Sequence, residues 1–259
     1  MKHPLRTLLL AVCCGLAAAC TQRQERLKLM SYNIRNGIGI DNIQDIDRIA
    51  RVILREAPDL VALQELDSAT LRVDGRYIPG ELGRMTGMHA TFGRAIGFAG
   101  GSYGIGLLSR SEPLAVRSIP LPGREEARVL LMAEFPDYTL CITPLSLTPE
   151  DRLASLPIIR EATDTCRKPV LLAGDFNTGN AAAVLAGLGG FRILSDTTRM
   201  TFPSDNPAVR IDYILGRGLP TSATVAESAV DHTATASDHC PLWVTLVWKR
   251  IVNASAQLI

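Results

Sequence analysis

The chain has 259 residues, 47% of them hydrophobic and 20% charged, and this composition excludes an intrinsically disordered protein. A formal net charge of +1 excludes a general attraction to nucleic acid. Any affinity for a polyanion would need a local basic patch, and the arginines are dispersed along the sequence.

The N-terminus has the features of an export signal. Lys2 and Arg6 precede an apolar run over residues 8–19 that is too short to span a bilayer comfortably. We therefore expect residues 1–19 to be a signal peptide, which is removed and takes no part in the fold.

The end of this signal is similar to a bacterial lipoprotein cleavage site. Three alanines precede Cys20, which would become the lipidated first residue, and polar residues 20–26 would form a tether. Cys14 is a second candidate for lipidation, and an ordinary secretory signal is the alternative. The protein is thus expected at the cell envelope, periplasmic or on the cell surface, with the lipid on Cys20 as its only membrane contact.

From residue 27 onward, strand and helix patterns alternate. Residues 27–34 and 60–63 have the apolar pattern of buried strands, and residues 45–56 between them place apolar side chains at helical spacing until Pro58. This is a β-α-β opening.

The middle of the chain has the pattern of an antiparallel meander, with short strands expected over residues 90–96, 105–109, 114–119, 129–135 and 139–143. Further helices are expected at 149–164, interrupted by Pro157, and at 181–188. The remaining strands are expected at 170–173 and near Ile211, Thr224 and residues 241–248. Since no linker divides the chain, we predict one α/β domain over residues 27–250, built from two packed sheets flanked by helices.

Five short polar signatures follow apolar runs: Ser-Tyr-Asn33, Leu-Gln-Glu65, Gly-Asp175-Phe-Asn177, Ile-Asp212-Tyr and Ser-Asp238-His239. Carboxylates, amides and one imidazole brought together from strand ends favour a divalent-cation site that handles phosphate.

Glu65, at the tip of a strand, is the best candidate for a metal ligand, with Asn33 on the neighbouring run. Asp175 and Asn177 are two residues apart, so on an extended segment both would face one ligand. Asp175 could then orient or deprotonate a water, and Asn177 could donate to a phosphate oxygen. The alternative for Glu65 is a solvated glutamate at a strand end, and for Asn33 an ordinary turn residue. For Asp175 and Asn177 the alternative is a strand that ends in an Asx turn.

Asp212 has apolar neighbours and therefore needs a partner. His239 suits this role, because a carboxylate fixes the imidazole tautomer and stabilises its charged form. A salt bridge to Arg210 is the alternative. Asp238 would add a second carboxylate for the metal.

In this order, and with Ser-Tyr103-Gly-Ile-Gly-Leu-Leu-Ser-Arg between Glu65 and Asp175, the signatures resemble the endonuclease/exonuclease/phosphatase superfamily over residues 27–248. The resemblance implies a DNase I-like four-layer α/β sandwich and Mg²⁺- or Mn²⁺-dependent phosphoester hydrolysis by in-line attack of water. It assigns the metal to Asn33, Glu65 and Asp238, and catalysis to Asp175, Asn177, Asp212 and His239. Tyr103 and Arg128 become expected phosphate contacts.

One position departs from the family pattern. Many members have Asn-Thr-His-Leu where this chain has Thr143-Pro144-Leu145, and proline neither donates a hydrogen bond nor transfers a proton. His89 and His232 are more simply interpreted as ordinary surface or core histidines.

The function expected is therefore a cell-envelope phosphoesterase, monomeric, acting on a diester or a small phosphorylated molecule. A nuclease is the nearest alternative, and a lipid head group is a further candidate substrate. A catalytically silent phosphate-binding lipoprotein is the alternative that Pro144 supports.

Overall fold

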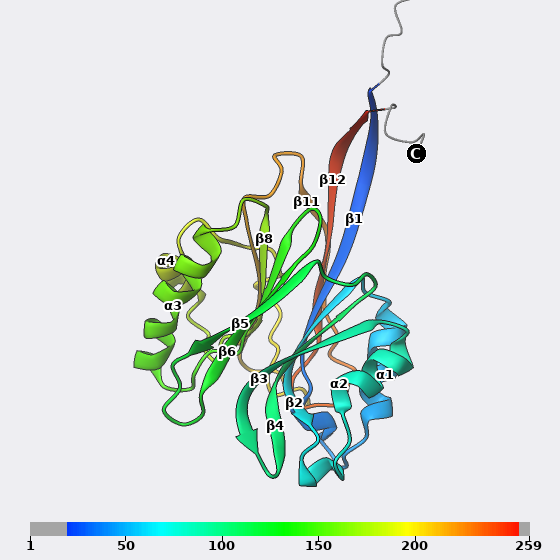
Figure 1. Ribbon diagram of the computed structural model, residues 1–259, viewed down its shortest axis with the longest axis vertical. Coiled ribbons are helices and arrows are strands. Elements are labelled where there is room, and N and C mark those ends of the chain that lie inside the picture. The colour runs from blue at the N-terminus through cyan, green and yellow to red at the C-terminus, as the bar shows by residue number, and fades with distance from the viewer. Residues whose placement is uncertain (1–19, 254–259) are drawn as a thin grey trace, which may run out of the picture.

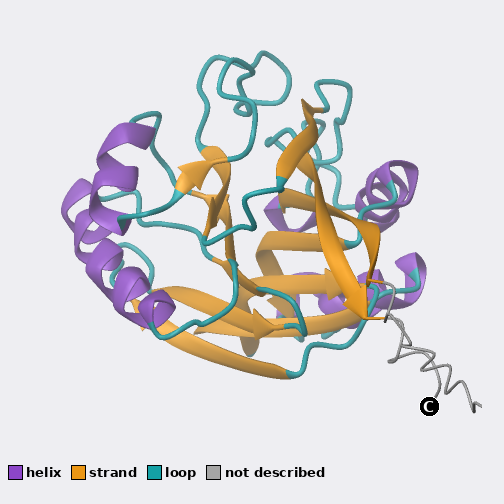
Figure 2. Cartoon of the chain, turned by 90° about the horizontal axis from the view of Figure 1, so that it is seen from above, coloured by secondary structure: helices purple, strands orange, loops and turns teal. Residues whose placement is uncertain are grey.

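Two six-stranded β-sheets pack face to face in the computed structural model, which describes residues 20–253 (Figure 1). Side chains that alternate along the strands fill the space between the sheets, among them Leu29, Leu107, Leu131 and Leu171. The opposite face of each sheet is covered by helices, as the view from above shows (Figure 2). This is the predicted four-layer α/β sandwich.

The first sheet has the strand order β11-β12-β1-β2-β4-β3. Its strands are β1 (Cys20–Asn33), β2 (Leu60–Ser68), β3 (His89–Phe98), β4 (Gly101–Ser109), β11 (Thr224–Val230) and β12 (Leu242–Asn253). β1 and β2 are parallel, and the other neighbours are antiparallel.

The second sheet has the order β5-β6-β7-β8-β10-β9. Its strands are β5 (Ala115–Leu121), β6 (Arg128–Glu134), β7 (Thr139–Ile142), β8 (Val170–Asp175), β9 (Arg192–Ile193) and β10 (Asp212–Arg217). The predicted meander is thus divided, because β3 and β4 pair in the first sheet and β5, β6 and β7 in the second.

Two helices cover each sheet: α1 (Ile46–Glu56) and α2 (Ile78–Thr86) on the first, α3 (Pro149–Asp164) and α4 (Ala181–Leu188) on the second. The Asp45 side chain caps α1 by accepting from Arg48 N, and Ala57 ends it in a left-handed conformation. Pro157 lies inside α3, which continues through it as one helix. Single 3₁₀ turns occupy Arg35–Gly37 and Leu71–Val73.

Residues 20–26, which we expected to form a tether, are instead the first half of β1. Their backbone pairs with β12, from Cys20 opposite Asn253 to Arg26 opposite Val247. Because β2 pairs only with the end of β1 and β11 only with the start of β12, residues 20–25 and 248–253 form a two-stranded ribbon that projects from the body (Figure 1). Residues 22–24 and 26 are exposed, which accounts for the polar composition of this part of β1. The expected signal peptide, residues 1–19, lies outside the described residues.

Within residues 20–253, no helix is both long and apolar enough to cross a membrane. Cys141, Cys166 and Cys240 are free thiols, and Cys141 and Cys240 are buried among hydrophobic side chains.

Candidate active site

The first sheet contributes Asn33 and Glu65. β1 ends at Asn33, which is opposite Gln64 of the parallel strand β2. Glu65 follows in a left-handed conformation (φ 59°), at a bulge where the β2–β4 register shifts between Leu63 and Leu66. Glu65 is therefore inside β2, and our prediction of a strand tip was wrong, because the bulge and not a strand end turns this side chain toward Asn33.

The second sheet contributes Asp175 and Asp212. Asp175 is the last residue of β8, Asp212 is the first of β10, and the two are directly opposite in the antiparallel register. Both are almost completely buried, with 3% and 1% of their surface exposed. Thr201 Oγ1 accepts from the backbone N–H of Asp212 and so helps to fix the start of β10.

His239 lies on the loop before β12. It is positioned by Ser237 and Phe202, two residues to which the sequence analysis gave no role. Ser237 Oγ donates to the backbone carbonyl of Asn33 at 2.8 Å, which fastens this loop to the end of β1. The Phe202 ring packs on the imidazole with ring centres 4.8 Å apart. Ser237 belongs to a recognised signature, but nothing in the local sequence marks Phe202, since its contact with His239 is set by the tertiary fold.

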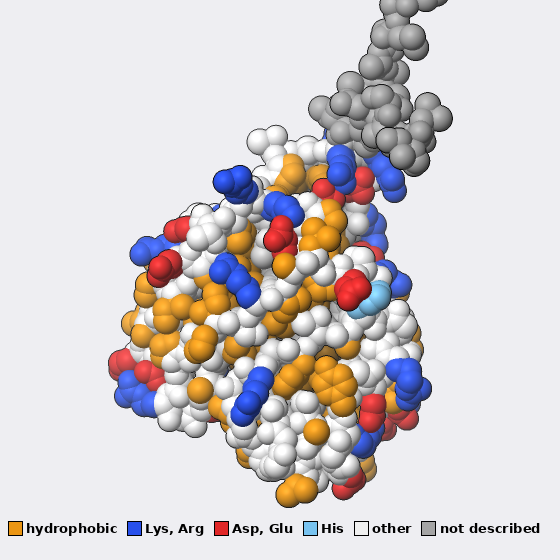
Figure 3. Space-filling model, in the orientation of Figure 1, with side chains coloured by type: hydrophobic (Ala, Val, Ile, Leu, Met, Phe, Trp, Pro, Cys, Tyr) orange, Lys and Arg blue, Asp and Glu red, His pale blue; other side chains and the backbone are white. Residues whose placement is uncertain are grey.

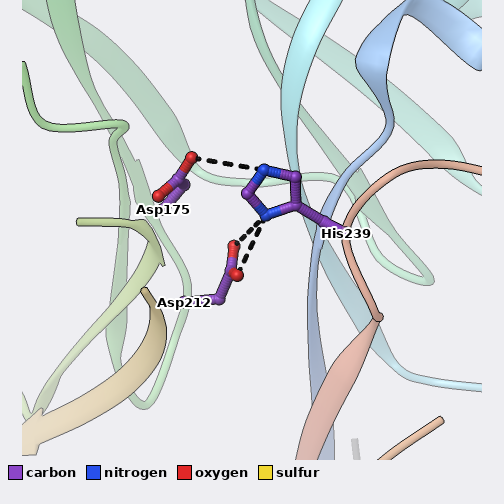
Figure 4. A group of neighbouring side chains, drawn as sticks. All are labelled: Asp175, Asp212 and His239. Atoms are coloured by element: carbon purple, nitrogen blue, oxygen red, sulfur yellow. Dashed lines mark hydrogen bonds and ion pairs between the residues drawn. The ribbon is translucent and has the colours of Figure 1, made fainter. Parts of the chain in front are cut away.

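The five side chains converge between the ends of the two sheets. His239 Nδ1 donates to Asp212 Oδ2 at 3.0 Å, and His239 Nε2 is 3.8 Å from Asp175 Oδ2 (Figure 4). Asn33 Nδ2 donates to Glu65 Oε1 at 2.9 Å and to Asp175 Oδ2 at 3.3 Å. The predicted Asp212–His239 pairing is present. Arg210 instead donates to Ser195 and to the Arg199 carbonyl.

Burial and crowding shift the pKa values of this cluster. Burial first, and then the charge of Asp212, raise the pKa of Asp175 to about 7. Burial alone would lower the pKa of His239, but Asp212, through its charge and its hydrogen bond, together with Asp175, raises it to about 10. At neutral pH the imidazole is thus charged, and the Asp175 carboxyl holds its proton to a much higher pH than an ordinary aspartic acid.

The donor atoms fit a hard divalent cation. Glu65 and Asp175 offer carboxylate oxygens on either side of Asn33, and Asp175, Asp212 and His239 form a buried group with ligand atoms within 4.8 Å of one another. Oxygen donors of this kind are what Mg²⁺ and Mn²⁺ prefer. A cation here would also relieve the repulsion between carboxylates that raises the pKa of Asp175.

Asn177 is placed differently from our expectation. It has a left-handed backbone (φ 49°), so the alternation of an extended strand does not apply to it. Its backbone N–H donates to Asp175 Oδ1 at 2.9 Å, which is the Asx turn considered as the alternative, and its Nδ2 donates to the Leu145 carbonyl at 2.8 Å. Asn177 therefore orients Asp175 and fixes the loop after Pro144.

Asp238 also differs from the expected arrangement. Its carboxylate is 3.5 Å from Arg35 Nε and 3.4 Å from Ser237 Oγ, with about a third of the side chain exposed. It is absent from the buried Asp175–Asp212–His239 group. Asp238 thus lies at the rim of the site, where Arg35 is its ionic partner.

Tyr103 and Arg128 line a small pocket together with Glu65, Glu126 and Pro144. The two predicted phosphate contacts are therefore next to the proposed metal ligand, and the proline that replaces the family histidine faces the same space. His232 is exposed and bonded to the Met200 carbonyl, and His89 is exposed at the start of β3. Neither histidine lines this pocket.

Gly174 has a steric reason to precede Asp175. A Cβ at this position would be 1.8 Å from the Thr143 carbonyl oxygen. We expect Gly174→Ala to lower the free energy of unfolding by roughly 3 kcal/mol, because the backbones of β8 and β7 would have to separate. Gly179→Ala, where the nearest atom is 3.4 Å away, is the control. Denaturant unfolding that shows equal stability of both variants would contradict this explanation.

Two sheets covered by helices, with buried carboxylates and an Asp–His pair at one end, define a phosphoesterase-like α/β sandwich. The family model described as "Endonuclease/Exonuclease/phosphatase family" matches residues 30–239, so the chain belongs to this family. Members of the family are phosphoesterases that generally depend on a divalent metal ion. No curated protein sequence matches the chain.

Solved structures share the fold. A family protein from Bacteroides thetaiotaomicron superposes with a TM-score of 0.71 and 19% identity, covering 88% of this chain and 97% of that one. A family protein from Beutenbergia cavernae gives 0.67 and 23%, with coverages of 86% and 72%. A mannosyl-6-phosphatase from Bacteroides thetaiotaomicron gives 0.67 and 19%, with coverages of 85% and 99%. At these identities the likeness establishes the fold.

Proposed function

We propose that this chain is a Mg²⁺- or Mn²⁺-dependent phosphoesterase that hydrolyses its substrate by in-line attack of water. The observation that carries this proposal is the convergence of Asn33, Glu65, Asp175, Asp212 and His239 from both sheets. Burial of Asp175 and Asp212 so close together is costly to folding, because the charge of one raises the pKa of the other, and this cost favours a retained site over a silent scaffold.

The roles of the side chains follow from their contacts. Asp175, whose carboxylate lies 3.8 Å from His239 Nε2, would accept the proton of the attacking water. Asn177 N–H holds this carboxylate from behind. Asp212 keeps His239 protonated and in a fixed orientation, and the imidazolium stabilises negative charge that develops on the phosphate oxygens.

Glu65, with Asn33 beside it, would hold the metal ion, and Asp238, paired with Arg35 at the rim, would add negative charge near it. The bound ion would supply Lewis-acid polarisation of a phosphate oxygen. Tyr103 and Arg128 face the same pocket and would contact the phosphate or its leaving group.

The proposed location is the cell envelope. A lipid on Cys20 would be at the start of β1, whereas Asn33 is at its end, so the anchor and the site would lie at opposite ends of a strand of 14 residues. The ribbon of β1 and β12 would then act as a spacer between membrane and catalytic domain (Figure 1). This arrangement supports a soluble phosphorylated small molecule over a lipid head group in the same membrane.

A nuclease is the second candidate within this chemistry. On the face shown in Figure 3, basic and acidic side chains are interspersed and do not gather into a basic surface. The small formal charge of +1 agrees with this. Backbone affinity for nucleic acid depends on such basic surfaces, so these observations favour small substrates for a monomeric enzyme.

Metal dependence tests the proposal. We expect hydrolysis of bis-p-nitrophenyl phosphate or p-nitrophenyl phosphate with Mg²⁺ or Mn²⁺, loss of turnover in EDTA, and at least a tenfold higher metal requirement in Glu65→Gln, since a ligand carboxylate is lost. Glu161→Gln, on the exposed side of α3, is the control. Absence of turnover on these compounds and on plasmid, lipid and sugar-phosphate substrates would favour a catalytically silent binding protein.

A further inference from the structure

We propose that Glu126 makes this site select singly charged phosphodiesters over doubly charged phosphomonoesters. The proposal rests on the phosphoesterase function proposed above and concerns the same site. Glu126 precedes β6 and lines the pocket that Glu65, Tyr103, Arg128 and Pro144 share.

The positive charge in this pocket is already compensated. Within the described residues, Arg128 is the one basic side chain of the lining. Its Nη1 donates to Glu126 Oε1 at 2.5 Å and its Nη2 to Glu125 Oε1 at 3.1 Å. Only 11% of the side chain is exposed; Nη1 and Nη2 are engaged by these two carboxylates, and the buried Nε has no hydrogen-bond partner in the described part of the chain. A bound phosphate would meet a neutralised or net negative group.

Glu125 is fixed in this arrangement. Its carboxylate accepts from Ser146 Oγ at 2.7 Å and from Leu147 N at 2.8 Å, both in the loop that follows Pro144. These bonds lower the pKa of Glu125 to about 2, although burial opposes them, so the carboxylate stays ionised. Glu125 therefore holds Arg128 in place, and Glu126 is the freer of the two acids that face it.

Two further arginines near the site, Arg35 and Arg72, are paired as well, and the Arg72 guanidinium lies 5.2 Å from the centre of the Tyr103 ring. Arg72 Nε donates to the buried carboxylate of Asp67 at 2.6 Å, and Arg35 lies 3.5 Å from Asp238. No unpaired arginine is thus left among these three to balance an extra charge on the substrate.

A second negative charge on the substrate would therefore be repelled. A phosphomonoester carries nearly two charges at neutral pH, because its second pKa is about 6, whereas a diester carries one. Burial raises the pKa of Glu126, the charge of Arg128 acts against this shift, and the charges of Glu65 and Glu125 add to it, which agrees with a pocket whose arginine is already compensated. Pro144 adds no donor for the additional oxygen.

Methyl p-nitrophenyl phosphate and p-nitrophenyl phosphate provide a matched test, since they share a leaving group and differ by one methyl group and one charge. With Mn²⁺ at pH 8, we expect Glu126→Gln to raise kcat/KM for the monoester about tenfold relative to the diester, because one unit of repulsion is removed in a partly screened pocket. The amide still accepts from Arg128, and the change should be mainly in KM. Glu161→Gln should leave the ratio unchanged.

If Glu126 had a purely structural role, its replacement would change kcat/KM for the monoester and for the diester by the same factor. An unchanged ratio of these two constants would overturn the selectivity proposal and leave the phosphoesterase function intact. Calorimetric binding of methyl phosphate and dimethyl phosphate to the Mn²⁺-loaded protein is the second measurement. We expect the variant to gain about tenfold in affinity for methyl phosphate only. Equal gains for both, or no gain, would also overturn the proposal. If neither ester is hydrolysed by the wild type, the phosphoesterase proposal itself fails.

Discussion

Replacing His239 by alanine lowers kcat for phosphoester hydrolysis by about 10³-fold, with a much smaller effect on KM, because the imidazolium acts on charge that develops in the transition state. The effect is expected to be large because the imidazole is buried, with 5% of its surface exposed, and because Asp212 holds it in one orientation at 3.0 Å. Steady-state kinetics with saturating Mn²⁺ measure both constants.

The Asp212–His239 pair should behave as a unit. Asp212→Asn is expected to lose a similar factor, and the double variant no more than His239→Ala alone, since the carboxylate acts through the imidazole. His232→Ala is the matched control, because this histidine is exposed and bonded only to a backbone carbonyl. Losses that multiply in the double variant would show that the two side chains act independently.

Asp175→Asn is expected to lower activity by at least 10³-fold and yet to stabilise the metal-free protein. The pKa of Asp175 is raised to about 7 in the folded protein. The contribution of such an acid to the free energy of unfolding is fully present below the pKa that it has in the unfolded chain, and it is lost as pH rises through 7. The amide does not titrate. The variant should therefore match the wild type near pH 4 and exceed it by roughly 2 kcal/mol at pH 8.

Denaturant unfolding in EDTA at the two pH values measures this difference, with Asp205→Asn in an exposed loop as the control. If the variant were less stable than the wild type at pH 8, the folded protein would stabilise the ionised carboxylate of Asp175. Asp175 would then be a poor candidate for the general base.

Much of the fold was predictable because the patterns are local. The apolar spacing of α1 and its Asp45 cap follow the sequence directly, as do the buried strands β1, β2 and β8. α2 was not predicted, because Ile78–Thr86 contains Pro79 and two glycines, and its formation depends on burial of Ile78 and Leu82 beneath the first sheet. The division of the meander between the sheets depends on long-range pairing.

The site was predictable in its residue types more than in its geometry. Asp175 and Asp212 are 37 positions apart, and only the register of β8 with β10 places them opposite each other. Glu65 and Asn177 both have positive φ values, so the periodicity of an extended strand gives the wrong direction for their side chains. Asp238 is adjacent to His239 but is drawn to Arg35, a contact that no local pattern encodes.

The convergence of these side chains on one cation and a bound oxyanion is tested most directly by diffraction from crystals soaked in Mn²⁺ and phosphate. We predict an anomalous peak within about 2.2 Å of a Glu65 carboxylate oxygen, with phosphate between it and the Asp175–His239 side of the cluster. Manganese bound only at other places, or phosphate held away from Asp175 and His239, would contradict the proposed active site.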